Sequence, residues 1–123
     1  MRIRGKVVSG IGEASWYVEK YSEVLKTHLG EKPYPGTLNI LLGECFNELL
    51  KGVKPIVINP PEEGLCSALG YIGYVKGYKV LVLKPLASRH DCRVVELIAG
   101  VKLRDVLGLR DGDEVEVDVI SSS

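Results

Sequence analysis

The chain has 123 residues, enough for one hydrophobic core and too few for two ordinary domains, so we expect a single domain over residues 1–123. Lysine plus arginine and aspartate plus glutamate each number 16, so the formal net charge is zero, which argues against the general electrostatic footprint of a nucleic-acid-binding protein but permits a local basic patch. Apolar runs such as residues 38–42 are too short to span a bilayer and the first residues carry no apolar signal core, so we expect a cytoplasmic protein without membrane contact.

The first predicted strand covers residues 2–9, where Arg2, Arg4 and Lys6 alternate with apolar or small residues. From residue 17 the period changes to that of an amphipathic helix. This predicted helix covers residues 17–29, and Gly30 follows it as a stop signal.

The middle of the chain is predicted to be mostly extended. Pro33 and Pro35 enforce an extended approach to a strand over residues 36–42. Residues 43–54 fit a short helix or a loop, and residues 55–59 fit an edge strand bounded by prolines. A hairpin follows, with strands over residues 71–75 and 78–83 joined by a tight turn at Lys76-Gly77.

The last third begins with a polar loop over residues 87–93 and a strand over 94–98, and continues with a short helix over 102–107 and the turn Asp111-Gly112-Asp113. Residues 114–119 alternate regularly, so one face of this strand is buried and the other solvated. Six or seven strands with two helices favour a mainly β (α+β) fold. We expect a compact, mostly antiparallel barrel in preference to a doubly wound sheet.

A glycine-bearing segment, Ser9-Gly10-Ile11-Gly12-Glu13-Ala14-Ser15, follows the first predicted strand. Its two glycines let backbone amides approach a bound anion closely. It is not a P-loop, because the Gly-Lys-Ser/Thr ending is absent, and it is not a dinucleotide fingerprint, because the third glycine is missing. An ordinary turn is the alternative interpretation.

Thr37 and Asn39 lie on the same face of a predicted strand, while Leu38 and Ile40 point to the other face. Two neutral oxygen ligands side by side can hold Mg²⁺ if nucleotide phosphates supply the negative charge. The alternative is that both residues form the solvent side of an edge strand.

The late loop Ser88-Arg89-His90-Asp91 precedes a strand that Glu96 interrupts. His90 fits a general base or a hydrogen-bonded surface residue. Glu96 must face solvent, a partner or a ligand, because burying an unpaired carboxylate is costly. Beyond the strand, Lys102 and Arg104 lie near the start of the short helix, where they can meet a phosphate or a base edge or simply form a solvated helix face.

Taken in chain order, these segments resemble the archaeal CTP-dependent riboflavin kinase family. That family has a G-x-G-E turn after its first strand, a proline-led G-T-L-N strand, a late E-x-I-A-x-x-K-L-R segment and a D-G-D turn. The match spans nearly the whole chain except residues 43–70, and the joint order is far more specific than any one motif. The matching segments here are Gly10-Ile11-Gly12-Glu13, Pro33-Tyr34-Pro35-Gly36-Thr37-Leu38-Asn39, Glu96-Leu97-Ile98-Ala99-Gly100-Val101-Lys102-Leu103-Arg104 and Asp111-Gly112-Asp113.

The resemblance implies a six-stranded cradle-loop barrel of the RIFT-related type that moves the γ-phosphate of CTP to the 5′-hydroxyl of riboflavin, giving FMN and CDP. It implies that Thr37 and Asn39 hold Mg²⁺, that Ser88 and Glu96 contact the flavin, and that Glu96 orients or deprotonates the hydroxyl. Ala14 and Ser88 depart from the family's frequent glycine and threonine, and we expect both to tune affinity only modestly. The implied nucleotide-binding residues are Ile11, Gly12, Glu13, Ala14, Ser15, Trp16, Val101, Lys102, Leu103 and Arg104.

Two other interpretations compete with this resemblance. Residues 103–113 also resemble swapped-hairpin transcription factors of the AbrB type, although those chains are generally shorter and dimeric, and the zero net charge speaks against DNA binding. A flavin-binding barrel without catalysis is the third interpretation. We expect a monomer with small-molecule partners, and no side-chain pattern by itself accounts for CTP in place of ATP.

Overall fold

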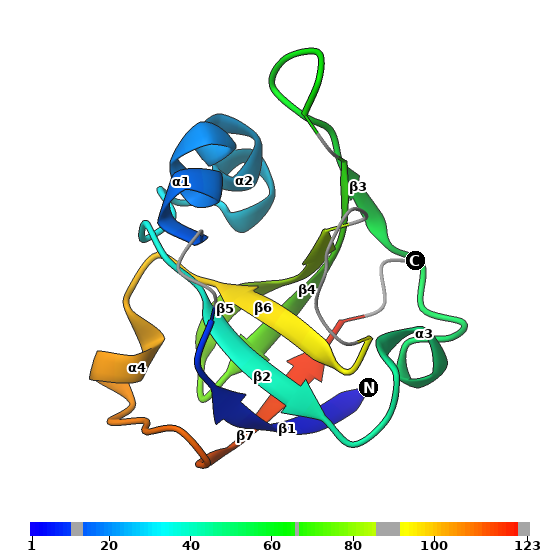
Figure 1. Cartoon of the computed structure of the whole chain (residues 1–123), viewed down its shortest axis with the longest axis vertical. Coiled ribbons are helices and arrows are strands. Elements are labelled where there is room, and N and C mark those ends of the chain that lie inside the picture. Colours follow the sequence, from blue (N-terminus) through cyan, green and yellow to red (C-terminus); the bar gives the residue numbers. More distant parts are fainter. Residues whose placement is uncertain (11–13, 66, 86–91, 121–123) are drawn as a thin grey trace.

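The computed structural model of the chain describes residues 1–10, 14–65, 67–85 and 92–120. Within these residues seven strands form one antiparallel sheet in the order β3-β4-β5-β6-β2-β1-β7. Strand β4 also pairs with β7, so six strands close into a barrel and β3 lies outside it on the edge of β4 (Figure 1). The strands are β1 (Arg2–Val8), β2 (Leu38–Leu42), β3 (Ile56–Ile58), β4 (Ala68–Val75), β5 (Tyr78–Pro85), β6 (Val94–Ile98) and β7 (Glu114–Val119).

The predicted barrel and its strands are confirmed, with small shifts at their ends. Strand β2 begins at Leu38 instead of residue 36, and β4 begins at Ala68 instead of residue 71. The hairpin turn is of the expected kind, because Lys76 and Gly77 have φ of 46° and 87°, and positive φ at both central residues is typical of a type I′ turn.

The barrel interior is filled by the apolar side chains that alternate along its strands. In β7, for example, Val115, Val117 and Val119 are buried and the intervening acidic residues are exposed. On the outside, Arg2 of β1 pairs with Asp118 of β7 at 2.8 Å. The alternation of the sequence therefore separates a dry core from a charged outer face.

Four helices are present among the described residues, where we expected two. They are α1 (Ala14–Lys20), α2 (Ser22–Leu29), α3 (Phe46–Leu49) and α4 (Leu103–Val106). The single helix expected over residues 17–29 is wrong because Tyr21, with φ −95° and ψ 10°, leaves the helical range while its buried ring stacks on Tyr17. Gly30 ends α2 with a φ of 87°, as predicted.

A second apolar cluster lies outside the barrel, where α1 and α2 cover β5 and β6 (Figure 1). Val18 and Leu25 of these helices pack with Leu81 of β5 and Ile98 of β6. The helices thus exclude solvent from part of the outer face of β6. Glu96 lies on this same face, two residues before Ile98. Within the described part of the chain, no helix combines the length and apolar character needed to cross a bilayer.

The seam between β4 and β7 leaves no room for a side chain at Gly73. A Cβ added there would lie 2.9 Å from Cγ1 of Val117 and 3.0 Å from the backbone oxygen of Asp118. Because that oxygen belongs to the neighbouring strand, relief requires the two strands to move apart. We expect Gly73→Ala to lower the free energy of unfolding by about 1–3 kcal/mol, the usual cost of overpacking, as measured by urea denaturation.

Gly43→Ala is the matched control for this prediction. A Cβ added at Gly43 meets no atom within 4 Å, so the free energy of unfolding should stay within about 0.5 kcal/mol of the parent value. Equal denaturation midpoints for the two variants would show that the seam accommodates a methyl group without strain.

Candidate functional site

Thr37 and Asn39 present two buried oxygen atoms on the outer face of β2. Leu38 and Ile40 point into the barrel core, so the alternation sends Asn39 outward, yet its side chain is only 6% exposed. Oγ1 of Thr37 and Oδ1 of Asn39 are both buried, and neither has a hydrogen-bond partner among the described residues. The alternative of a plain solvent-facing edge is therefore wrong. Buried oxygens without partners are rare in folded proteins and call for an explanation such as a bound cation.

The start of the glycine turn lies directly against Asn39. A Cβ added at Gly10 would collide with Nδ2 of Asn39, so only glycine lets the backbone approach this amide so closely. This contact joins the end of β1 to β2, whose residues Val8 and Asn39 are also partners in the sheet register. Gly10, the described start of the first predicted site segment, is thereby placed beside the side chain of Asn39.

Glu96 faces Asn39 across the pairing of β2 with β6. The two residues are direct partners in the register, and both point to the outside of the barrel because their neighbours Leu38 and Leu97 fill its core. Opposed side chains in an antiparallel pair have Cβ atoms roughly 4.5–5.5 Å apart. The half-buried carboxylate of Glu96 is therefore close enough to act on the same ligand as Asn39.

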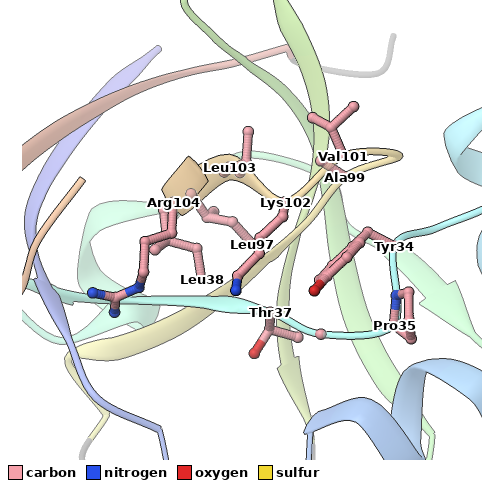
Figure 2. A pocket seen from close by; sticks show the side chains of 11 residues that line it. Tyr34, Pro35, Thr37, Leu38, Leu97, Ala99, Val101, Lys102, Leu103 and Arg104 are labelled. Atoms are coloured by element: carbon pink, nitrogen blue, oxygen red, sulfur yellow. The ribbon is translucent and has the colours of Figure 1, made fainter. Parts of the chain in front are cut away.

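A pocket of about 200 Å³ opens beside this face, at the start of β2 and beyond the end of β6. Its two rims are held together by a 2.8 Å hydrogen bond from the backbone N–H of Tyr34 to the oxygen of Ala99. Figure 2 shows the ammonium of Lys102 pointing toward Thr37, with the hydroxyl of Tyr34 directed into the same space. The lining residues are Tyr34, Pro35, Gly36, Thr37, Leu38, Leu97, Ala99, Val101, Lys102, Leu103 and Arg104.

The charged and polar groups in and beside this pocket favour a negatively charged ligand bound together with a metal cation. Among the described residues, Lys102 makes a long ion pair of 3.9 Å with Asp105, which leaves its ammonium able to meet a ligand. Among the described residues no group of three or more His, Cys, Asp or Glu side chains is placed to hold a metal. Thr37 and Asn39 are neutral, so they fit Mg²⁺ only if the ligand supplies negative oxygens, as a triphosphate does.

The family model that matches residues 7–119 is labelled CTP-dep_RFKase and described as "Domain of unknown function DUF120". The chain belongs to the CTP-dependent riboflavin kinase family. Proteins named riboflavin kinase from Staphylothermus marinus, Pyrobaculum arsenaticum and Pyrococcus abyssi are 41%, 39% and 37% identical to it, over 95%, 98% and 96% of this chain. The chain spans 90% of the first of these relatives but only 61% and 58% of the other two.

Membership of this family argues against the AbrB-type interpretation, and so does the topology. The pairing of β4 with β7 closes the barrel within a single chain, whereas a swapped-hairpin factor completes its fold with a second chain. The resemblance proposed from the motifs of residues 10–13, 33–39, 96–104 and 111–113 is thus confirmed.

The structure brings together five of the predicted site residues in one pocket: Thr37, Val101, Lys102, Leu103 and Arg104. Asn39 and Glu96 do not line this pocket; they lie on the outer face of the barrel, two residues after Thr37 and one residue before Leu97 along the chain. Ala14, Ser15 and Trp16 form the first turn of α1, where Ser15 is exposed and Trp16 is 57% exposed, and neither of these two lines the pocket. Ile11, Gly12, Glu13, Ser88 and His90 fall outside the described residues, so their roles stay predictions.

Tyr34 is a pocket residue that the sequence analysis did not identify. It lies between Pro33 and Pro35, and we interpreted these prolines only as enforcing an extended backbone. The available signal was the aromatic residue itself, because a tyrosine held between two prolines loses little further backbone freedom when it meets a ligand. Its hydroxyl adds a hydrogen-bonding group to those of Thr37, Lys102 and Arg104 (Figure 2).

Proposed function

We propose that the chain transfers the γ-phosphate of CTP to the 5′-hydroxyl of riboflavin, giving FMN and CDP. The observation that supports this most directly is the shared location of three groups: the buried oxygens of Thr37 and Asn39, the carboxylate of Glu96, and the cations of Lys102 and Arg104. Phosphoryl transfer mainly requires positioning and stabilisation of spreading negative charge. Family membership and the names of the relatives support the same reaction.

The pocket between residues 34–38 and 97–104 is the proposed site for part of the nucleotide. Val101 and Leu103 provide apolar surface there, while Lys102 and Tyr34 provide polar groups. Ligand pockets commonly enclose roughly 300–1,000 Å³, so a pocket of about 200 Å³ holds only a fragment of a nucleoside triphosphate. The choice of CTP as the donor is supported by membership of the family.

Thr37 and Asn39 would hold Mg²⁺ through Oγ1 and Oδ1. When bound, the ion supplies charge neutralisation to the phosphate oxygens during transfer. The protein's own part is to keep two oxygens buried and free of competing hydrogen bonds from the described residues. Gly10 contributes by packing against Asn39 and fixing the orientation of its amide.

Glu96 is the proposed catalytic residue. From its position opposite Asn39 its carboxylate would accept a hydrogen bond from the 5′-hydroxyl of riboflavin and take the proton as the new phosphate ester forms. Lys102 would stabilise the negative charge that spreads over the transferred group, whereas Arg104 would bind the part of the nucleotide that CTP and CDP share. Ser88 would contact the flavin, and Ile11 to Trp16 would contact the nucleotide, as the family resemblance implies.

The decisive experiment incubates the protein with riboflavin, Mg²⁺ and one of CTP, UTP, ATP or GTP, and separates FMN by chromatography. We expect FMN with CTP, with UTP the next best donor and the purine nucleotides poor. Equal rates with all four nucleotides would identify a riboflavin kinase without a preference for CTP. FMN binding without product from any donor would identify a flavin-binding barrel without catalysis.

A further inference from the structure

Asp111 lies in the turn before β7 and contacts both Ser9, at the end of β1, and Arg104 of α4. Its Oδ2 accepts a hydrogen bond from Oγ of Ser9 at 2.6 Å, and its Oδ1 accepts one from a guanidinium nitrogen of Arg104 at 2.9 Å. Ser9 directly precedes Gly10, and Arg104 lines the pocket. One carboxylate therefore connects the two segments to which the proposed function assigns the nucleotide.

The turn that carries Asp111 is itself fixed to the barrel by backbone hydrogen bonds. The N–H of Gly112 donates to the oxygen of Val7 at 2.7 Å, and the N–H of Val7 donates to the oxygen of Asp113 at 2.8 Å. A further bond runs from the N–H of Arg110 to Oδ2 of Asp113 at 2.8 Å. Asp111 is thus held at a defined place beside the end of β1, which makes it a fixed anchor for Arg104.

The charge on Asp111 is maintained by its two partners. The hydrogen bond from Ser9 and then that from Arg104 lower the pKa of the Asp111 carboxyl below its ordinary value, so the group is ionised at neutral pH. The bond to Asp111 uses one of the donors of Arg104, and a guanidinium has five N–H groups in a rigid fork. Arg104 can therefore bind an anionic ligand while Asp111 holds it.

We propose that Asp111 is a positioning residue that holds the guanidinium of Arg104 beside Ser9, oriented to receive the nucleotide before it binds. This inference rests on the proposed function. Exposed ion pairs add little to protein stability, and here the side chains of Arg104 and Asp111 are 36% and 55% exposed. The benefit lies in binding, because a pre-oriented arginine loses less side-chain entropy when the ligand arrives.

The test is Asp111→Asn, which keeps the shape of the side chain and removes its charge. We expect KM for CTP to rise about threefold to tenfold, the cost of ordering one long side chain, while kcat and KM for riboflavin stay near parent values. Calorimetric titration with CDP, which cannot donate a γ-phosphate, should show the same loss of affinity. Ser9→Ala, which removes one of the two bonds without changing charge, should give a smaller loss in the same direction.

A double-mutant cycle shows whether Asp111 acts through Arg104. In the Arg104→Ala background, Asp111→Asn should cause no further loss of CDP affinity, because the group that it positions is gone. A full additional loss in that background would overturn the proposal. Unchanged or tighter CDP binding by Asp111→Asn alone would also overturn it, since the carboxylate would then only repel the phosphates.

Asp118→Asn is the matched control. Asp118 is a similarly exposed carboxylate, 60% accessible, and makes a 2.8 Å ion pair with Arg2 on the outer face of β1 and β7. The control should bind CDP as the parent does. An equal loss of CDP affinity in the control would mean that the change in net charge alone weakens binding, and this would overturn the proposal. A parent protein that neither binds CDP nor makes FMN would refute the proposed function itself, whereas an active parent with an unaffected Asp111→Asn variant would refute only the positioning role.

Discussion

Replacing Glu96 with glutamine is expected to lower kcat for FMN formation by roughly 10²-fold or more, the usual contribution of a general base. Glutamine has nearly the same size and can still form a hydrogen bond, but it cannot take the proton of the acceptor hydroxyl. Glu96 is only half-buried, and its register partners Asn39 and Leu83 remain in place, so the barrel should fold normally. Single-turnover measurements with saturating CTP and riboflavin isolate the transfer step.

Glu114→Gln is the control for this change. Glu114 is an exposed carboxylate at the start of β7 that pairs with Arg4 at 3.0 Å, away from the pocket of residues 34–38 and 97–104. Its kcat should match that of the parent. If Glu96→Gln retained a rate within a few-fold of the parent while Glu114→Gln did the same, Glu96 would orient the hydroxyl without accepting its proton.

Local strands of this fold can be predicted well because period-two alternation coincides with burial on one side. The bounds of β6 and β7 match the sequence prediction, and the Lys76-Gly77 turn adopts the backbone that its residues favour. The closing contact between β4 and β7 could not be predicted, because barrel packing decides which strand edges meet. Gly73, which has no room for a side chain at that contact, is recognisable only once the neighbouring strand is known.

The helices are harder to predict because their ends depend on tertiary packing. Residues 43–54 fit a helix or a loop in isolation, and the structure forms only a four-residue helix there, with Phe46 buried in the barrel core. Tyr21 interrupts an otherwise regular amphipathic pattern because its ring is buried against the outside of the barrel. The spacing of apolar residues along these segments predicts neither the short length of α3 nor the interruption at Tyr21.

Parts of the candidate site could likewise be predicted from local pattern alone. Alternation correctly puts Thr37 and Asn39 on one face, but it does not reveal that Asn39 is buried, since Gly10 packs against it from a distant part of the chain. The sequence puts Asp111 in a turn and in the D-G-D motif of the family, but it assigns Asp111 no role in the site. Its bonds to Ser9 and Arg104 depend on the barrel bringing the two ends of the chain together.

Thr37→Val is expected to separate stability from function. Because Oγ1 of Thr37 is buried and has no hydrogen-bond partner among the described residues, replacing it with a methyl group removes a desolvated oxygen without breaking a bond. The midpoint of thermal unfolding should therefore stay the same or rise. Affinity for Mg²⁺ in the presence of nucleotide should fall on the order of 10- to 100-fold, the loss that even supporting residues of metal sites produce.

The measurement is the Mg²⁺ concentration that gives half-maximal FMN formation, together with CDP titrations at several Mg²⁺ concentrations. Thr27→Val is the matched control, because Oγ1 of Thr27 donates a 3.0 Å hydrogen bond to the backbone oxygen of Glu23 on the exposed face of α2. In that variant a hydrogen bond is lost, so stability should fall slightly while the Mg²⁺ dependence stays at the parent value. An unchanged Mg²⁺ dependence in Thr37→Val would mean that its buried oxygen is not a metal ligand, and Asn39 would then have to hold the cation without it.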